Sequence, residues 1–268
     1  MKTYYDQVKQ RLIFLHQPAS PDYWDRLWAN SDLAAVFEQA ARERFITGCT
    51  RQWLPPNKST AILEGGCGRG EMVYALRQAG FNAIGIDFAV QTIHRTLAFM
   101  PDLPVTVGDV ANLPFPDHSF DGYWSLGVIE HTFTGYERIL QEMQRVVKPG
   151  GFIFITFPHL SLLRRTKARL GAYPNFTPSA VPPSAFYQFA FSRPSVQSDL
   201  EQLGFRFRYA RAVDGFKGIK QELPRLAPAL QFLAANPSPL VRLAATAINV
   251  AAAPWAGHIM LLAMQKND

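Results

Sequence analysis

Cysteines, and long uncharged hydrophobic runs, are scarce in this sequence. Cys49 and Cys67 are its two cysteines, too few for a disulfide framework or a four-ligand metal site. The first 14 residues lack the apolar stretch of a secretory signal. The longest uncharged apolar stretch near the C-terminus, residues 243–257, is shorter than the roughly 20 residues that a spanning helix needs. We therefore expect a cytoplasmic protein with no metal and no transmembrane span.

Charge is moderate in amount but unevenly placed. Hydrophobic residues make up 48% of the 268 residues and charged residues 18%, which indicates a folded globular chain rather than a disordered one. Residues 161–220 hold ten Lys or Arg against three acids. Such a segment favours an anionic partner, namely an acidic substrate, a lipid headgroup or nucleic acid, but an ordinary solvated face would have the same composition.

The hydrophobic pattern predicts a doubly wound α/β fold. Residues 1–58 are expected to form helices without strands, and from residue 59 short apolar strands alternate with helices. Strands that are apolar throughout, each followed by a helix, are typical of a parallel sheet covered on both faces. We predict a mostly parallel, seven-stranded, Rossmann-like sheet whose site lies at the carboxyl ends of its strands. The expected strands are 61–66, 82–87, 104–110, 120–129, 152–157, 205–213 and 257–266.

Three regions of one domain follow from this pattern. We expect an N-terminal helical cap over residues 1–58, a nucleotide-binding core over 59–160, and a lid with a helical insertion and the last strands over 161–268. Within 225–256, two short apolar helices are split by 236–239; they can enlarge the cap, touch a membrane surface or pair with another subunit. The sequence makes no prediction of the oligomeric state.

An uncharged aromatic stretch stands out within the third region. No charged residue occurs between Gly171 and Ser192. The stretch is either a proline-stiffened substrate lid or a loop packed on the edge of the sheet. Its prolines are Pro174, Pro178, Pro182 and Pro183, and the candidate lid residues are Tyr173, Phe186, Tyr187 and Phe189.

A glycine-rich loop joins the first expected strand to the first helix of the core. Its glycines Gly66, Gly68 and Gly70 allow a sharp turn and a close approach of the backbone to a ligand. The helix that begins near Gly70 points free N–H groups at whatever binds there.

The spacing of this loop disfavours a dinucleotide-binding enzyme. A dinucleotide fingerprint would place its third glycine at position 71, where this chain has Glu71. Glu64 stands just before the loop, where a carboxylate would repel phosphates but suit a cationic amino acid. Asp87 closes the second strand, 17 residues after Gly70, where it can accept hydrogen bonds from ribose hydroxyls.

At this point the sequence resembles the class I methyltransferases that use S-adenosylmethionine. The run LEGGCGRG (residues 63–70) resembles their first motif and IGIDFA their second, while GDVANLPFPDHSFDGYWSLGVIEH and VVKPGGFIFIT resemble those that follow. The form is that of small-molecule methyltransferases of ubiquinone and menaquinone biosynthesis, and the likeness covers about residues 59–160.

The resemblance implies a role for each motif residue. Glu64 and the loop Gly65, Gly66, Cys67, Gly68 and Gly70 would hold the amino acid part of the cofactor. The ribose would bind Asp87, the adenine would meet Phe88, Asp109 and Val110, and the methyl group would lie over Ser125, Leu126 and Gly127 with His131 beside it. From the residues alone other roles stay open: Asp87 can cap the second helix, Asp109 can be a turn residue, and Cys67 can simply fill space.

The expected activity is methyl transfer from S-adenosylmethionine to a small, largely apolar acceptor, such as a quinone precursor, a phenol or a lipid-like acid. Positioning is the main catalytic contribution expected, and a hydroxyl acceptor would benefit from a general base, for which His131 and His159 are candidates. Otherwise His131 lines the cofactor and His159 caps a loop. A nucleic-acid methyltransferase is disfavoured because the sequence lacks the motif of enzymes that methylate exocyclic base amines. A non-catalytic scaffold is disfavoured because the glycines of the loop and Asp87 are intact.

Overall fold

The computed structural model describes residues 2–177 and 183–268, which fall into two compact units. We call them the core unit (Pro18–Ile155, Asp199–Arg208 and Ala263–Asp268) and the second unit (Met1–Gln17, Thr156–Ser198 and Tyr209–Leu262). The second unit is built from segments that lie far apart along the chain.

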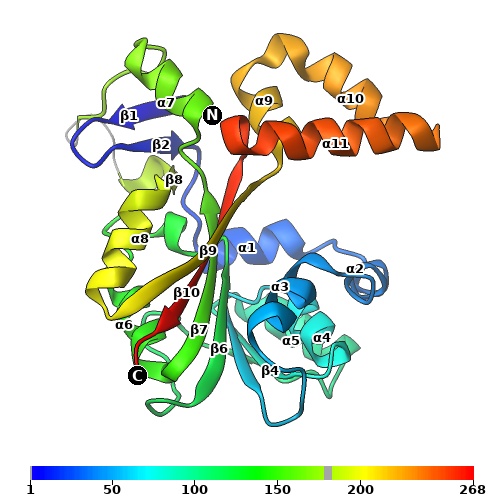
Figure 1. The fold of residues 1–268 in the computed structure, drawn as a ribbon. Coiled ribbons are helices and arrows are strands. Elements are labelled where there is room, and N and C mark those ends of the chain that lie inside the picture. Colours follow the sequence, from blue (N-terminus) through cyan, green and yellow to red (C-terminus); the bar gives the residue numbers. More distant parts are fainter. Residues whose placement is uncertain (1, 178–182) are drawn as a thin grey trace. The chain divides into compact units, whose positions relative to one another are not determined.

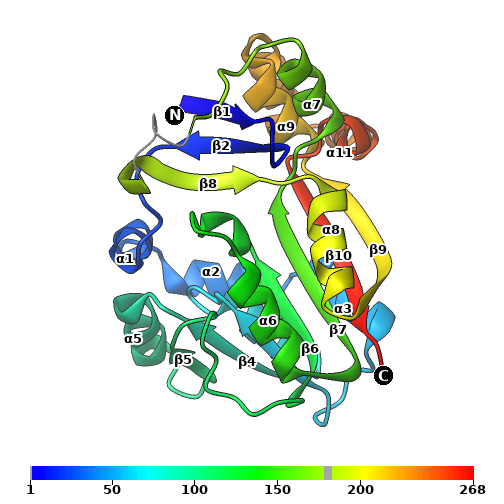
Figure 2. The same cartoon turned by 90° about the vertical axis from the view of Figure 1, so that its left-hand side faces the viewer.

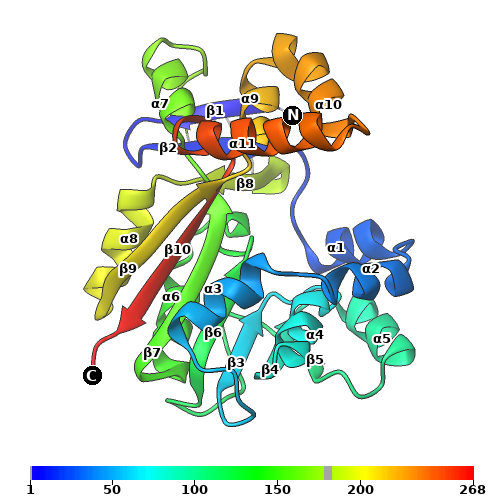
Figure 3. The same cartoon turned by 45° about the vertical axis from the view of Figure 1, so that its right-hand side comes forward.

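The helices and strands appear in Figures 1 to 3. The strands are β1 Lys2–Asp6, β2 Arg11–Leu15, β3 Ala61–Gly65, β4 Asn82–Asp87, β5 Val105–Val107, β6 Phe120–Leu126, β7 Val147–Pro158, β8 Phe186–Ala190, β9 Phe205–Val213 and β10 Ile259–Lys266. The α-helices are α1 Pro21–Trp28, α2 Leu33–Ala40, α3 Phe45–Trp53, α4 Glu71–Gln78, α5 Val90–Phe99, α6 Glu137–Val146, α7 Leu162–Arg169, α8 Arg193–Gln202, α9 Gly215–Glu222, α10 Ala227–Ala235 and α11 Pro239–Ala256. The 3₁₀ helices are η1 Ile129–His131, η3 Pro183–Ala185 and η4 Pro224–Leu226.

The predicted seven-stranded sheet is confirmed. Its strand order is β5-β4-β3-β6-β7-β10-β9, with parallel pairing of β3 to β4, of β3 to β6 and of β4 to β5. The strands are apolar because both faces are covered: Leu63, Trp124 and Phe154 are fully buried, and Trp124 stacks on Phe154 with ring centroids 4.5 Å apart. The strands that follow β3 in sequence are first added on one side of it (β4, β5) and then on the other (β6, β7). The loops that follow β3, β4 and β6 therefore meet at one edge of the sheet.

The expectation that residues 1–58 contain no strand is wrong. β1 and β2 form an antiparallel hairpin, and β2 also pairs with β8 to give a three-stranded sheet in the second unit. The turn between β1 and β2 has no Asn-Gly pair, which is the usual sequence signal of a hairpin. The Asp6 side chain holds the turn instead, by accepting hydrogen bonds from the N–H groups of Val8 and Lys9. The last turn residue, Gln10, has a φ of 47°. The partner of β2 lies some 170 residues away in the sequence, so a local pattern could not reveal it.

The aromatic stretch that the sequence analysis singled out forms part of this small sheet. Phe186 and Phe189 lie in β8 and are only 3% and 1% exposed, so they belong to the core of the second unit. Tyr173 donates a hydrogen bond from its hydroxyl to Glu222. Pro178 and Pro182 fall outside the described residues.

Three helices near the C-terminus complete the second unit. As predicted, the apolar segment is split, into α10 and α11, and α11 packs against α9 and α7. Leu163, Ile219 and Ala256 form a small buried cluster where α7, α9 and α11 meet. Within 2–177 and 183–268, no helix is both long enough and apolar enough to cross a membrane.

Candidate active site

The glycine loop between β3 and α4 has the geometry of a ligand cradle. Gly66, Gly68 and Gly70 have φ values of 77°, 53° and 76°, in the left-handed region where a side chain is unfavourable. A Cβ on Gly66 would stand 2.4 Å from Val128, and one on Gly68 would stand 2.9 Å from the ring of Trp28. The amides of Gly66 and Cys67 both donate to the Ile86 carbonyl, which ties the loop to β4.

Asp87 closes β4 and is almost completely buried. One carboxylate oxygen accepts a hydrogen bond from the Gly68 amide and the other from the Ala89 amide, each at 2.8 Å. Burial raises the pKa of Asp87, and the hydrogen bonds from these two amides oppose the shift. Each oxygen keeps a second lone pair, so the side chain can still accept hydrogen bonds from two hydroxyl groups of a ligand.

The sequence analysis left open that Asp87 caps the second helix of the core, α5. In the structure another residue caps this helix. The carboxylate of Asp25, on α1, accepts hydrogen bonds from the amides of Gln91 and Thr92 in the first turn of α5. Helix α5 is therefore capped from outside its own segment. Asp87 instead joins the glycine loop to the end of β4.

Glu64 is a buried carboxyl group at the edge of the glycine loop. Its side chain is 2% exposed, and its Oε2 atom has no hydrogen-bond partner among the described residues. Burial, with smaller contributions from Glu71 and Asp87, raises the pKa of Glu64 well above its usual range. A buried carboxylate oxygen that lacks a hydrogen-bond donor is costly, so a ligand ammonium group that donates to Oε2 would be favoured.

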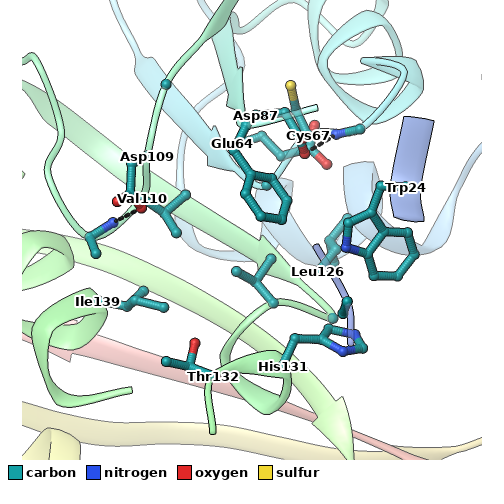
Figure 4. A pocket seen from close by; sticks show the side chains of 18 of the residues that line it. Trp24, Glu64, Cys67, Asp87, Asp109, Val110, Leu126, His131, Thr132 and Ile139 are labelled. Atoms are coloured by element: carbon teal, nitrogen blue, oxygen red, sulfur yellow. Dashed lines mark hydrogen bonds between the residues drawn. The ribbon is translucent and has the colours of Figure 1, made fainter. Parts of the chain in front are cut away.

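These groups open into one cavity of about 710 Å³, built by the core unit alone. Figure 4 shows Glu64, Cys67 and Asp87 close together, Asp109 and Val110 on another wall, and Trp24 beside His131. The volume is in the range of small-molecule and cofactor sites. The lining residues are Ala19, Trp24, Trp28, Glu64, Gly66, Cys67, Gly68, Arg69, Glu71, Met72, Asp87, Phe88, Gly108, Asp109, Val110, Ala111, Leu126, Gly127, Val128, His131, Thr132, Thr134, Gly135, Arg138 and Ile139.

Most residues predicted to bind the cofactor lie around this cavity. The ones that line it are Glu64, Gly66, Cys67, Gly68, Asp87, Phe88, Asp109, Val110, Leu126, Gly127 and His131. Gly65, Gly70 and Ser125 are not among the lining residues. Gly65 packs against the Tyr123 hydroxyl, Gly70 is the N-cap of α4, and Ser125 is fully buried in β6. Asp109 is exposed and accepts a hydrogen bond from the Ala111 amide, so it also acts as a turn residue.

His159 and the four candidate lid residues belong to the second unit and are not among the residues that line the cavity. His159 is 7% exposed, and its burial, helped by the nearby Arg164, lowers its pKa to about 4. A histidine with so low a pKa stays neutral at physiological pH and is a weak base.

The sequence analysis missed the contribution of α1. Trp24 and Trp28 stack with ring centroids 5.1 Å apart, and Trp24 meets His131 edge to face at 5.2 Å. Asp25 holds this helix to α5, and Arg95 donates a hydrogen bond to the Trp28 carbonyl. Two tryptophans four residues apart on one helix were the only local signal, and that spacing is equally typical of a core-facing helix.

A second group of missed residues follows the IEH motif. Thr132, Thr134, Arg138 and Ile139 line the cavity from η1 to the start of α6. Arg138 donates a hydrogen bond from Nε to the Ala111 carbonyl, and its outer nitrogen lies 3.7 Å from Glu142. This guanidinium is the cation nearest in sequence to His131, and its side chain is 62% exposed.

Comparison with known proteins agrees with this geometry. Residues 63–155, which hold the glycine loop, Asp87, Asp109 and His131, match the protein family described as "Methyltransferase domain". These residues, about a third of the chain, are therefore similar to a methyltransferase domain. The predicted fold class and the predicted resemblance to class I methyltransferases are thereby confirmed.

Individual relatives share this domain rather than the whole chain. The sequence is 32% identical over 98 residues to a probable S-adenosylmethionine-dependent methyltransferase of Mycolicibacterium smegmatis (37% of this chain, 38% of the relative). It is 36% identical over 106 residues to the 2-methyl-6-phytyl-1,4-hydroquinone methyltransferase of Synechocystis. This match covers 38% of this chain and 32% of the relative. The chain thus matches about a third of the length of these relatives. A crystal structure of a putative sarcosine dimethylglycine methyltransferase from Galdieria sulphuraria shares the fold, with a TM-score of 0.53, 16% identity and coverage of 92% of this chain and 98% of that one.

S-adenosylmethionine is the cofactor of this domain family, and the residues of the cavity fit it. The unpartnered Oε2 atom of Glu64 matches an ammonium group, and Gly66 and Gly68 line the cavity without side chains. Asp87 can accept hydrogen bonds from ribose hydroxyls. Phe88 is 39% exposed and lines the cavity, where an adenine ring can lie against it.

Proposed function

We propose that the chain is an S-adenosylmethionine-dependent methyltransferase whose acceptor is a small, largely apolar molecule with a phenol- or quinol-like hydroxyl. The observation that carries the proposal is the convergence of Glu64, the glycine loop and Asp87 on one cavity whose farther wall is aromatic. The bound cofactor would supply an activated methyl group, and the protein would hold the acceptor in line with it.

The character of the remaining wall supports an apolar acceptor with one anionic or hydroxyl oxygen. Trp24, Val128 and Ile139 offer apolar contacts, while Thr132 and Arg138 offer hydrogen-bond donors. Arg138 can pair with a phenolate or carboxylate oxygen. The relative from Synechocystis bears the name of a hydroquinone methyltransferase, which agrees with this chemistry.

Calorimetric titration of the purified chain tests the cofactor assignment. We expect S-adenosylmethionine and S-adenosylhomocysteine to bind at one site per chain and NADH not to bind, because Glu64 and the loop spacing oppose a pyrophosphate. Labelled S-adenosylmethionine should then transfer its methyl group to an alkylated hydroquinone in preference to an oligonucleotide. Binding of NADH alone would refute the proposal. Binding of both adenosyl ligands without transfer to any hydroxyl acceptor would favour a non-catalytic scaffold.

His131 is the better of the two candidate bases, because it lines the cavity whereas His159 does not. We expect His131→Ala to lower turnover by roughly a hundredfold while the affinity for S-adenosylmethionine stays within a few-fold. Single-turnover rates and calorimetric affinities measured on the same preparations check this. His159→Ala is the comparison, with turnover expected to be largely unchanged. Parallel loss of turnover and cofactor affinity in His131→Ala would show that His131 only lines the cofactor.

A further inference from the structure

Helix α11 presents its large apolar side chains to solvent and its small ones to the protein. Ala245, Ala253 and Ala256 are its buried residues and face α9 and α7. On the opposite side of the helix lie exposed residues at a spacing of three or four, and none of them is polar. They are Leu240, Leu243, Ala244, Ala247, Ile248, Ala251, Pro254 and Trp255.

Helix α10 and the residues before it extend this apolar surface. No residue of α10 is buried, and Leu226 and Phe232 are 48% and 69% exposed. Figures 1 and 3 show α10 and α11 next to one another within the second unit. We call the exposed residues Leu226, Phe232, Leu240, Leu243, Ile248 and Trp255 the α10–α11 face. Exposed apolar surfaces of this extent usually mark a binding surface.

The charge of the second unit indicates what covers this face. Residues 223–258 contain no Asp or Glu, and their charged side chains are Arg225 and Arg242. Over its full sequence the second unit holds 13 Lys or Arg against 3 acids, a net charge of +10, whereas the core unit holds 14 against 18, a net charge of −4. Two of the three acids, Asp6 and Glu222, are buried in ion pairs.

Basic side chains also occur on the two helices that pack against the buried side of α11, opposite the α10–α11 face. Arg165 and Arg169 on α7 and Lys217 on α9 are exposed, and both helices pack against α11 (Figure 2). An apolar helix face without acids, on a unit with a large positive charge, is the pattern of helices that lie in the interface of an anionic bilayer. A tryptophan at the end of such a helix suits the headgroup region. A second copy of the chain fits less well, because two units of +10 would repel each other.

We propose that the α10–α11 face lies on the surface of a membrane that contains anionic lipids, inserting its apolar side chains without crossing the bilayer. The affinity then has an apolar part, from Leu243, Ile248 and their neighbours, and an electrostatic part that salt weakens. The proposal stands apart from the methyl-transfer activity, because the second unit contributes no residue to the described cavity.

Flotation of the whole chain with vesicles tests this proposal. We expect co-flotation with phosphatidylcholine vesicles that contain phosphatidylglycerol, much less with pure phosphatidylcholine, and less again at high salt. Leu243→Glu or Ile248→Glu should weaken binding about tenfold or more. The matched control is Val8→Glu, since Val8 is exposed, apolar and in the same unit but outside the face. Each variant keeps its fold if its far-ultraviolet circular dichroism and its unfolding temperature match those of the wild type.

Three outcomes would overturn the proposal. The first is that the wild-type chain does not co-float with anionic vesicles. The second is that Val8→Glu weakens flotation as much as Leu243→Glu does, because binding would then not depend on the face. The third is that Leu243→Glu changes the mass of the protein in solution from a dimer to a monomer without altering flotation, which would show that a second copy covers the face.

Discussion

Asp87→Ala is expected to lower the affinity for S-adenosylmethionine by more than about a hundredfold. Two hydrogen bonds from ligand hydroxyls to a buried carboxylate contribute roughly 1.5–3 kcal/mol each. The substitution also removes the acceptor of the Gly68 amide, so the glycine loop loses its link to the end of β4. Both effects lower the affinity for the same ligand. Calorimetric titration of the wild type and the variant measures their sum.

Two comparison variants separate these effects. Asp87→Asn keeps the shape and one acceptor oxygen, so its loss of affinity should be intermediate. Asp109→Ala removes an exposed carboxylate that accepts a hydrogen bond from a single amide. We expect its affinity for S-adenosylmethionine to stay within about tenfold of the wild type. If Asp87→Ala bound the cofactor as tightly as the wild type, the assignment of the ribose site to Asp87 would be wrong.

The part of the cavity that we assign to the cofactor could be predicted from the sequence, because one short segment builds each part of it. The glycine loop and Asp87 end neighbouring strands, β3 and β4, and the carboxyl ends of parallel strands meet at one edge of the sheet. Asp109 follows β5, Leu126 ends β6 and His131 follows β6, and all three reach the same cavity. The period of the hydrophobic pattern and the order of the motifs were therefore sufficient.

The acceptor side could not be predicted in this way, because segments without a local signal build it. Trp24 enters the wall only because Asp25 and Arg95 fix α1 against α5, and neither contact has a sequence pattern. The hairpin of β1 and β2 was missed for a related reason, since its turn depends on the Asp6 side chain and its pairing on the distant β8. Tertiary contacts outweigh local preference in both cases.

Glu222→Gln is expected to lower the free energy of unfolding of the second unit by about 3–5 kcal/mol. Glu222 is the carboxylate partner of Arg164, which is 1% exposed, and of Lys167, with nitrogen–oxygen distances of 2.9 and 2.8 Å. Arg164 also donates to the His159 carbonyl and contacts His258, so it joins α7 to the segments before β10 and around β7. Glutamine fits the same space but carries no charge, and an uncompensated buried guanidinium is costly.

The pH dependence of this loss provides a second test. Burial alone would raise the pKa of Glu222, but hydrogen bonds from Lys167, Tyr173 and Arg164 overcome that effect and lower it. A carboxyl whose folded pKa lies below its unfolded value stabilises the fold above about pH 4.3 and loses this contribution as the pH falls through the folded pKa. Wild type and Glu222→Gln should therefore differ most at neutral pH and converge in acid.

Calorimetry and urea unfolding, each at neutral and acid pH, measure the difference between wild type and variant. The matched control is Glu38→Gln on α2, which removes the partner of Arg42 in an ion pair whose side chains are 67% and 77% exposed. A pair so exposed to water contributes little, and the control should lie within about 1 kcal/mol of the wild type at every pH. If both substitutions changed the free energy of unfolding equally, the ion pairs around Arg164 would be hydrated in solution. Packing around α7 and α9, rather than the buried ion pair, would then hold the second unit together.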